Sequence, residues 1–313
     1  MSTSMPRAIL VTGSSGWLGR HLVPRLRGAG HRVVGLDVVA GPMTDRVGSI
    51  VDRAFVRDVL AAEGITAIVH GGALHKPNIV THATKEFVDV NVTGTLNLLE
   101  EAVRPGSLVD RFVFTSTTSV MISREVRAGA AGGAREAAWS TEELAPLLPR
   151  NIYGVTKLSA EHLCRMFHEQ HGLPVVVLRT SRFFPEDDDM AHAIVQSEEN
   201  TKANELLFRR LTVEDAAEAH VAALARAPEL GFDTFIVSAP TPFQRGDVRA
   251  LIEDAPAVVA RYFPGYRDVY ARLGWTMFDV IDRVYDASRA TARLGFTCRT
   301  GFAERLAELA RRG

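Results

Sequence analysis

Short apolar runs and amphipathic stretches alternate along most of this 313-residue chain. Apolar residues at steps of three and four predict helices, whereas short β-branched runs predict strands. The expected strands are residues 8–12, 31–37, 65–70, 111–116, 174–179 and 234–237, and the expected helices are residues 16–28, 52–62, 84–103, 153–171 and 213–221. Short apolar strands joined by helices form a parallel sheet that helices cover on both faces. The pattern therefore predicts an α/β fold with a doubly wound parallel sheet.

Composition and charge exclude several classes of protein. The chain is 46% hydrophobic and 23% charged, which is ordinary for a protein with a substantial core. Its 36 basic and 37 acidic residues give a net charge of −1, and no basic block indicates nucleic acid or an anionic membrane as a partner. No apolar run has the length of a membrane span, and the N-terminus lacks the apolar core of a signal peptide. We therefore expect a cytoplasmic protein.

Cysteine and histidine positions give no indication of a metal. Cys164 and Cys298 lie far apart and match no metal-ligand spacing, and neither do the ten histidines. Two cysteines in a chain of this size suit a reducing compartment, and we expect both to be buried thiols.

A glycine-rich turn follows the first expected strand and opens the first expected helix. Gly13, Gly16 and Gly19 stand three residues apart, a variant of the usual dinucleotide-binding spacing. Glycine lets the backbone turn tightly and approach a pyrophosphate, which then binds the amides at a helix N-terminus. Asp37 ends the second strand, where its carboxylate can bind an adenosine ribose and repel a 2′-phosphate. This arrangement favours NAD over NADP; the alternative is a plain glycine turn with a solvent-facing aspartate.

Tyr153 and Lys157 form the main candidate for catalysis. Four residues apart on the helix expected after Pro149, they lie on one face and one turn apart. A phenol titrates near 10, and a nearby ammonium group favours the phenolate. Such a pair can act as a general acid and base on the hydroxyl of a sugar or alcohol. The alternative is an amphipathic helix that carries both residues by chance.

These motifs, with several others, resemble the extended short-chain dehydrogenase/reductase family, in its NAD-dependent epimerase/dehydratase group. Residues 12–19 look like the family's cofactor loop, 70–73 its His-x-Ala-Ala segment, 91–95 its Asn-x-x-Gly-Thr, 114–120 its active-site strand end, and 286–290 with 294–296 its C-terminal signature. The resemblance covers nearly the whole chain. It implies an NAD-binding Rossmann domain of residues 1–180 plus 213–238, and a substrate-binding lobe of residues 181–212 plus 239–313.

The resemblance also implies roles for individual residues. Tyr153 would be the acid/base, Lys157 would lower its pKa and hold the nicotinamide ribose, and Thr117 would hydrogen-bond the reacting oxygen. The implied cofactor-binding residues are Gly13, Gly16, Trp17, Leu18, Gly19, Asp37, Ser49, Ile50, Gly71, Gly72, Ala73, Asn91, Thr115, Tyr153 and Lys157. Thr117 is found by counting back from Val120, and a plain strand-end threonine is its alternative.

Several positions depart from the family pattern. Ser49 stands where the family has an acidic residue, which weakens the expected adenine contact. Met121-Ile122 replaces the usual Tyr-Gly. Thr118 and Ser119 stand where the 4,6-dehydratases carry Asp-Glu, so loss of water is disfavoured. The small residues of 128–134 predict a flexible loop over the site.

The expected substrate lobe offers two candidates. Arg182 stands where the family often has a sugar-contacting asparagine, at the mouth of the expected cleft. Its planar, permanently charged fork suits carboxylate or phosphate, so we predict an anionic sugar-type substrate. The alternative is that Arg182 neutralises the acidic turn at 186–188. His75 is the second candidate, with a surface-loop histidine as its alternative.

Three functions remain open from the sequence. The first is an NAD-dependent enzyme acting at a hydroxyl or keto carbon of a sugar or nucleotide sugar, as an epimerase. The second is a net dehydrogenase of a small sugar acid, which the short segment between Phe184 and Leu211 favours because it lacks a recognisable nucleotide-binding stretch. The third is a non-catalytic NAD-binding regulatory protein. By the resemblance, helices 84–103 and 153–171 would pair two copies into a homodimer.

Overall fold

Seven strands form one sheet in the computed structural model, which describes residues 7–183 and 196–312. The strands are β1 (Ala8–Thr12), β2 (Arg32–Asp37), β3 (Arg46–Val47), β4 (Ala67–His70), β5 (Phe112–Thr117), β7 (Val175–Thr180) and β8 (Phe232–Val237), in the order β3-β2-β1-β4-β5-β7-β8. Pairing is parallel from β3 across to β7. The chain therefore leaves β1 toward one side and returns at β4 on the other, which makes β1 and β4 the switch point of the sheet.

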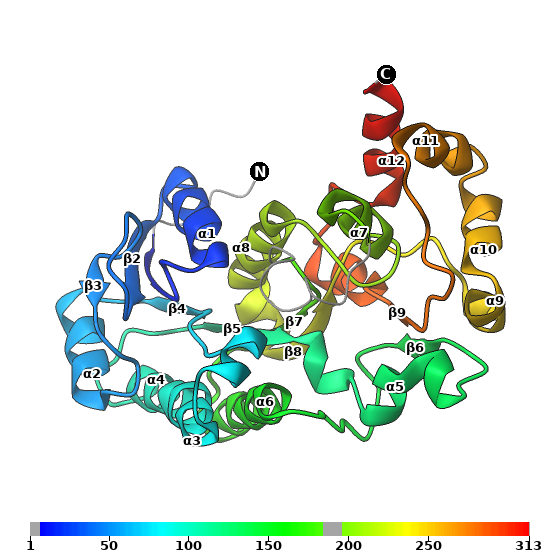
Figure 1. The fold of residues 1–313 in the computed structure, drawn as a ribbon. Helices are drawn as coiled ribbons and strands as arrows, with labels where there is room; N and C mark the ends of the chain where they lie inside the picture. Colours follow the sequence, from blue (N-terminus) through cyan, green and yellow to red (C-terminus); the bar gives the residue numbers. More distant parts are fainter. Residues whose placement is uncertain (1–6, 184–195, 313) are drawn as a thin grey trace. The chain divides into compact units, whose positions relative to one another are not determined.

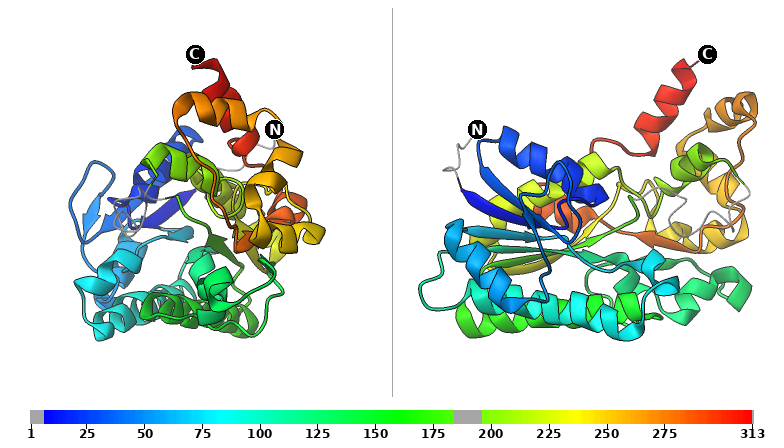
Figure 2. Two further views of the ribbon diagram at one scale, coloured as in Figure 1. Left: turned by 45° about the vertical axis from the view of Figure 1, so that its right-hand side comes forward. Right: turned by 60° about the vertical axis from the view of Figure 1, so that its left-hand side comes forward.

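Helices cover both faces of this sheet, as Figures 1 and 2 show. The helices are α1 (Trp17–Gly28), α2 (Arg53–Ala62), α4 (Gly94–Ala102), α6 (Ile152–His171) and α8 (Val213–Leu230). One face carries Leu10, Ile68, Phe112 and Val175, which pack against α2, α4 and α6 in one buried cluster. On the opposite face lie α1 and α8 (Figures 1 and 2). The predicted doubly wound α/β fold is confirmed.

The stretch predicted as one helix at 84–103 is helical but not uniform. Residues Thr84–Phe87 form α3, Val88–Thr93 form a π-helical segment, and α4 follows directly. Asn91 lies in the π-helical segment, where its carbonyl accepts a hydrogen bond from Thr95 Oγ1 at 2.7 Å. Because π-helical turns inside helices often mark functional sites, the distortion at Asn91 points to this position.

The chain divides into two compact units, each built from three segments. The first comprises Met1–Val120, Asn151–Thr180 and Ala216–Phe235, and the second comprises Met121–Arg150, Ser181–Asp215 and Ile236–Gly313. Residues 121–150 thus belong to the second unit, whereas the sequence placed them with the first. The difference arises because this segment carries β6 (Ala138–Ser140), which pairs in parallel with β9 (Arg283–Tyr285) late in the chain.

The second unit is mainly helical around a small aromatic core. Besides β6 and β9 it holds α5 (Arg124–Ala128), α7 (Glu198–Glu205), α9 (Val248–Glu253), α10 (Ala255–Tyr262), α11 (Tyr266–Leu273) and α12 (Phe302–Arg311). Tyr266, Tyr270 and Phe302 are buried in its core. The expected flexible loop at 128–134 is wrong in part, because Gly129–Gly132 form a 3₁₀-helix. Gly129 has a φ of +51°, and a Cβ there would lie 2.8 Å from Asp282, so a larger residue would not fit.

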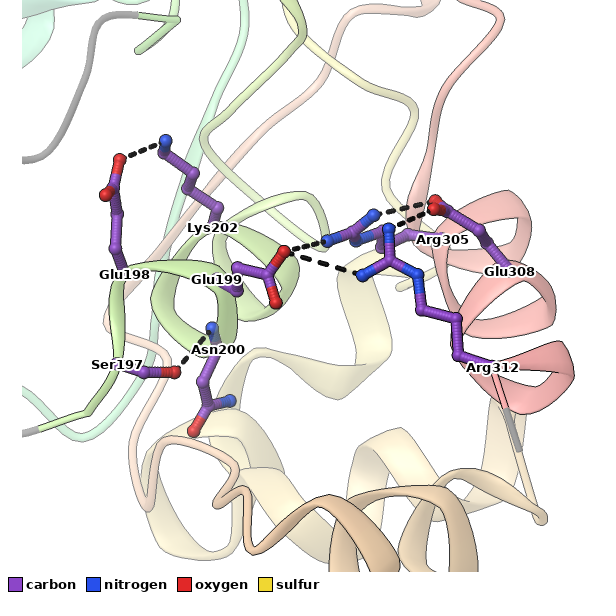
Figure 3. A network of polar contacts seen from close by, with 8 residues as sticks. All are labelled: Ser197, Glu198, Glu199, Asn200, Lys202, Arg305, Glu308 and Arg312. Atoms are coloured by element: carbon purple, nitrogen blue, oxygen red, sulfur yellow. Dashed lines mark hydrogen bonds and ion pairs between the residues drawn. The ribbon is translucent and has the colours of Figure 1, made fainter.

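Exposed charges join α7 to α12 at the surface of this unit (Figure 3). Glu199 accepts from Arg305 at 3.4 Å and from Arg312 at 3.5 Å, and both arginines also contact Glu308. Ser197 Oγ accepts from Asn200 N at 3.3 Å and so caps α7. Solvent-exposed ion pairs of this kind contribute little to stability.

Within residues 7–183 and 196–312, no helix is long and apolar enough to cross a membrane. The same residues hold no group of three or more His, Cys, Asp or Glu side chains placed to bind a metal ion. Both cysteines are free thiols; Cys164 is buried as expected, whereas Cys298 is only half-buried.

Candidate active site

The ends of β1 and β4 touch through glycine backbone. Gly13 has a φ of +75°, and a Cβ there would lie 2.8 Å from Gly72 N and 2.9 Å from the carbonyl carbon of Gly71. A Cβ on Gly19 would lie 2.4 Å from Gly13 O. No side chain fits between these segments, so the backbone of the first turn is brought directly over the end of β4 at the switch point of the sheet.

The N-terminus of α1 begins where this turn ends. Gly16 is the residue that precedes the helix, and its N–H donates to Gly13 O at 3.1 Å. The first amides of a helix lack partners within it, and Gly16 has no side chain with which to cap them. Trp17 is 40% exposed, whereas Leu18 and Gly19 are buried. The turn thus presents backbone amides and the positive end of a 12-residue helix, which suits a pyrophosphate.

Asp37 lies beside this turn, as its position at the end of β2 predicts. Its Oδ2 accepts from Ser15 N and its Oδ1 from Val39 N, each at 3.0 Å. A carboxylate has about four acceptor positions, so capacity remains for two ribose hydroxyls. The Ser15 amide therefore orients the carboxylate toward the glycine turn.

Ser49 and Ile50 lie in the short segment after β3, and helix α4 holds this segment in place. Ile50 is buried, and a Cβ on Gly94 would lie 2.6 Å from its Cγ1. Its carbonyl accepts from Asn97 Nδ2 at 3.0 Å, while Ser49 Oγ accepts from Val51 N at 3.2 Å. The adenine contact of Ser49 and Ile50 stays a prediction.

Asn91 joins the loop after β4 to the candidate catalytic helix. Its Oδ1 accepts from Leu74 N at 2.8 Å, and its Nδ2 donates to Leu74 O at 2.8 Å and to Thr156 Oγ1 at 3.0 Å. Both ends of the amide are thus used within the protein. Asn91 consequently fixes the backbone next to Ala73 and the helix turn next to Lys157, and direct contact with a cofactor stays a prediction.

Helix α6 carries Tyr153 and Lys157 as predicted. Asn151 Oδ1 accepts from Gly154 N at 2.9 Å, which caps the helix and fixes its start. Tyr153 is half-buried in the first turn. Thr117 is the last residue of β5, and its Oγ1 accepts from Ser119 N at 3.1 Å. Its own hydroxyl hydrogen remains available to donate.

Lys157 is only 3% exposed, and its Nζ lies 4.0 Å from the ring centroid of Phe114 on β5. Desolvation lowers the pKa of Lys157 to about 7, against electrostatic interactions with Cys164 and Glu161 that raise it. The amine is thus poised between its two forms near neutral pH. A phenolate forming close by would favour the ammonium form.

Thr115 also lies on β5, but its hydroxyl is engaged within the protein. Its Oγ1 lies 2.8 Å from Nε2 of the buried His220 on α8. His220 Nδ1 lies 2.7 Å from the carbonyl oxygen of Ala216 and must donate to it, so Nε2 accepts from Thr115. A cofactor contact by Thr115 stays a prediction, and its hydroxyl could then only accept a hydrogen bond, because its hydrogen is given to His220.

His75 and Arg182 differ in their surroundings. His75 precedes a 3₁₀-helix (Lys76–Val80) in the first unit, and its N–H donates to Asn78 Oδ1 at 2.9 Å. Arg182 belongs to the second unit, where its Nε lies 3.9 Å from Glu205 Oε2. The acidic turn at 186–188, the alternative partner of Arg182, lies outside the described residues. Substrate contact by either residue stays a prediction.

Sequence reasoning missed the residues that hold α6 in place. Glu161 accepts from Arg179 Nη2 at 2.7 Å and Nε at 3.1 Å, and also from Ser116 Oγ. All three are buried, so this contact fixes α6 against β5 and β7. The signal was available: Glu161 lies one turn after Lys157, and the strand residues Ser116 and Arg179 are polar within apolar runs.

The sequence pattern of the NAD dependent epimerase/dehydratase family matches residues 9–233. The chain belongs to this family. Its cofactor is NAD, and the glycine turn, the first amides of α1 and Asp37 fit that molecule. The members that give this family its name are enzymes. This chain has the tyrosine and lysine of the motif on α6, Tyr153 and Lys157.

Similar proteins within the NAD-dependent epimerase/dehydratase family have more than one activity. UDP-glucose 4-epimerase 4 of Oryza sativa subsp. japonica is 30% identical over 192 residues, which are 55% of this chain and 48% of that protein. Uronate dehydrogenase of Pseudomonas putida is 26% identical over 196 residues, 61% of this chain and 66% of that protein. The chain spans about half the length of the first curated relatives it matches.

Solved structures show the same fold over nearly the whole chain. UDP-glucose 4-epimerase of Thermotoga maritima, solved with UDP-glucose, aligns with a TM-score of 0.67 at 20% identity, over 97% of this chain and 99% of that one. A short-chain dehydrogenase/reductase superfamily protein of Agrobacterium tumefaciens, solved with bound NAD, aligns with a TM-score of 0.65 at 22% identity, over 97% of each chain.

Proposed function

We propose that this chain is an NAD-dependent enzyme that acts at a hydroxyl or keto carbon of a sugar or nucleotide sugar. The observation that carries the proposal is the arrangement around α6. Tyr153 and Lys157 share one face of this helix, and Lys157 is buried against β5, the strand that ends at Thr117. Bound NAD supplies the acceptor and donor of the hydride.

Each side chain has a distinct task in the proposed reaction. Tyr153 takes the proton from the substrate hydroxyl as the carbon is oxidised, and returns it when a keto group is reduced. Lys157 stabilises the phenolate form of Tyr153 by its charge. Thr117 donates its free hydroxyl hydrogen to the reacting oxygen. Asn91 and Glu161 do not contact the substrate in this scheme, but they hold α6 in the position from which Tyr153 and Lys157 carry out the proton transfer.

Two outcomes of the same chemistry are distinguished by the fate of the hydride. An epimerase returns it to the sugar, as the relatives named UDP-glucose 4-epimerase would. A dehydrogenase releases it as NADH, as the relative named uronate dehydrogenase would. Arg182 fits both outcomes, since a guanidinium suits the carboxylate of a sugar acid and the phosphates of a nucleotide sugar alike.

Purified protein should be tested for NAD retained through a sizing column, and then for NADH absorbance with a uronate and with UDP-glucose. Retained NAD and UDP-galactose formation without net NADH support an epimerase, whereas NADH accumulation with the uronate supports a dehydrogenase. Hydride transfer from neither substrate, in protein that binds NAD, would contradict the proposed choice of substrates. If the purified protein does not bind NAD at all, the proposal as a whole is wrong.

A homodimer is part of the proposal. Val88 is 42% exposed and Val155 is 45% exposed, and they lie on the two segments, 84–103 and 153–171, that the sequence assigned to a dimer contact. Pairing of these two segments with a second copy would bury both valines. Light scattering on the eluting peak measures the mass, and a monomer at micromolar concentration would contradict this part.

A further inference from the structure

His70 occupies a fully enclosed position between the two central strands of the first unit. It ends β4 and stands opposite Thr12, the last residue of β1, in the sheet register. Its side chain is 1% exposed. Nδ1 lies 2.7 Å from Thr12 Oγ1, and Nε2 lies 3.0 Å from Thr95 Oγ1. Both ring nitrogens are therefore engaged, and the imidazole joins a strand end to a helix.

The neighbouring bonds determine which nitrogen carries the hydrogen. Thr95 Oγ1 gives its only hydrogen to the carbonyl of Asn91, at 2.7 Å, so it offers only lone pairs to His70. His70 Nε2 must then donate. A neutral imidazole accepts at the other nitrogen, so Nδ1 accepts from Thr12 Oγ1, which itself accepts from Gly72 N at 3.0 Å. In this series of hydrogen bonds, the donor and the acceptor of each bond are thus determined.

Burial supports the neutral form that this direction requires. Desolvation, followed by the charge of Lys157, holds the pKa of His70 well below its usual value. A protonated ring would place a second donor against Thr12, whose hydrogen already points at Nδ1, so the bond would have to reverse.

Both ends of this chain of bonds reach the cofactor side of the first unit. At one end, Gly72 is packed against Gly13 of the glycine turn, with no room for a side chain. At the other end, Asn91 holds Leu74 of the loop after β4 and Thr156 of α6. A change at His70 would therefore shift both Gly72, which packs against the glycine turn, and Asn91, which contacts α6.

We propose that His70 is a positioning residue that, as the neutral Nε2–H tautomer, ties the glycine turn to the helix segment at Asn91 and so sets the affinity for NAD. This role concerns the cofactor and goes beyond the proposed sugar chemistry. His70 reaches the cofactor only through Thr12, Gly72 and Thr95, and it takes no part in moving the substrate proton.

His220 provides a matched comparison in the same unit. It is equally buried, with both nitrogens bonded, but its Nδ1 donates to Ala216 one turn earlier on its own helix. The two histidines therefore have opposite tautomers. His220 does not connect the glycine turn to another element. Its loss should therefore lower the stability of the fold.

The tautomers can be read directly from NAD-free protein. Histidine-labelled ¹⁵N protein at pH 7.5 should show long-range ¹H–¹⁵N couplings typical of Nε2–H for His70 and of Nδ1–H for His220. Spectra of His70→Asn and His220→Asn assign the two rings. A His70 ring found charged, or protonated at Nδ1, would overturn the proposal.

Binding of NAD, measured by calorimetry, tests the positioning role. His70→Leu should raise the Kd for NAD tenfold or more, while His220→Leu, which removes only the partner of the Thr115 hydroxyl, should lower the melting temperature and raise that Kd by a clearly smaller factor. His70→Asn keeps an acceptor near Nδ1 and His70→Gln a donor near Nε2, so each should recover part of the affinity. These two variants decide the matter if the leucine variant fails to fold. Unchanged NAD affinity in folded His70 variants would assign His70 to stability alone.

Discussion

Two buried glutamates show how differently the two units treat charge. In the first unit, Glu161 meets a single guanidinium, that of Arg179, through hydrogen bonds at 2.7 and 3.1 Å. In the second unit, Glu205 is 1% exposed and contacts three described arginines: Arg210 at 2.8 Å, Arg209 at 2.6 Å and Arg182 at 3.9 Å. The first arrangement is a bidentate pair, and in the second one carboxylate is shared among three arginines.

The difference indicates how firmly each unit holds its charged side chains in place. A bidentate pair between buried partners fixes both side chains, so α6 and its tyrosine are held in one place. A contact of 3.9 Å exceeds hydrogen-bond distance, so Arg182 and Glu205 do not form a bidentate pair of this kind. We therefore expect the first unit to determine the chemistry and the second to determine which substrate is bound.

The largest expected effect tests the chemistry of the first unit. Tyr153→Phe should lower kcat by ~10²–10⁴, because it removes the proton carrier but keeps the ring. The Kd for NAD, measured by calorimetry, should stay near that of the unchanged protein. Near-full turnover in the variant would remove Tyr153 from the mechanism and end the assignment of the chemistry to α6.

Acid should destabilise the first unit through its neutral histidines. Burial lowers the pKa of His220 from 6.5 to about 4, so below pH 6.5 the unfolded chain takes up a proton that the folded chain does not. Stability at this site is complete above pH 6.5 and falls as the pH falls toward 4, by about 3 kcal/mol in total.

Urea unfolding at several pH values measures this loss. Other groups also titrate in this range, so the useful quantity is the difference between the unchanged protein and His220→Asn. The variant should show a shallower loss of stability between pH 6.5 and 4. Parallel curves for the two proteins would show that His220 is not kept neutral by the fold.

Cofactor choice tests the other end of the first unit. Asp37→Ala should weaken NAD binding by about ten- to a hundredfold, since hydrogen bonds to a charged group contribute about 1.5–3 kcal/mol. The variant should also discriminate less against NADP, because the repelling carboxylate is gone. Calorimetry with both dinucleotides decides; a preference of the unchanged protein for NADP would refute the role of Asp37.

Substrate affinity tests the second unit. Arg182→Met should raise KM for an anionic sugar by roughly ten- to a hundredfold with little change in kcat, through loss of a charge-assisted contact. Arg209→Met is the matched control, because Arg209 shares the same Glu205. Equal effects of the two substitutions on KM, or none from Arg182→Met, would assign Arg182 to the charge cluster alone.

The smallest effect is expected at the surface of the second unit. Glu199→Gln removes the negative charge from both contacts to α12 drawn in Figure 3, at a side chain that is 59% exposed. Exposed pairs contribute less than about 1 kcal/mol, and added salt should abolish the difference. Thermal melts at low and high salt measure it. A large, salt-independent loss would mean that charge is as firmly placed here as at Glu161.

Local patterns predicted the sheet and the positions of the main site residues. The glycine turn, the end of β2 at Asp37 and the helix with Tyr153 and Lys157 lie where spacing placed them, and Thr117, which the family resemblance picked out, ends β5. Each depends on residues within a few positions of one another, and short apolar runs between turns leave few alternatives in a parallel sheet.

Contacts between distant segments could not be predicted in this way. Strands β6 and β9 have three residues each and pair across more than a hundred positions, so no local pattern identifies them. The bonds from His70 to Thr12 and Thr95 require the register of β1 on β4, which the sequence does not state. The run at 128–134 was misjudged because small residues suit a tight 3₁₀ turn as well as a loop.

The order in which the chain contributes to the first unit has a consequence for its synthesis. The last two strands of the sheet, β7 and β8, arrive after 121–150 and after 181–215, two segments that belong to the second unit. A nascent chain therefore cannot finish the first unit until these two segments, nearly half of the second unit, have left the ribosome. No single continuous fragment contains one unit without part of the other, so a nick in either inserted segment should be tolerated better than its excision.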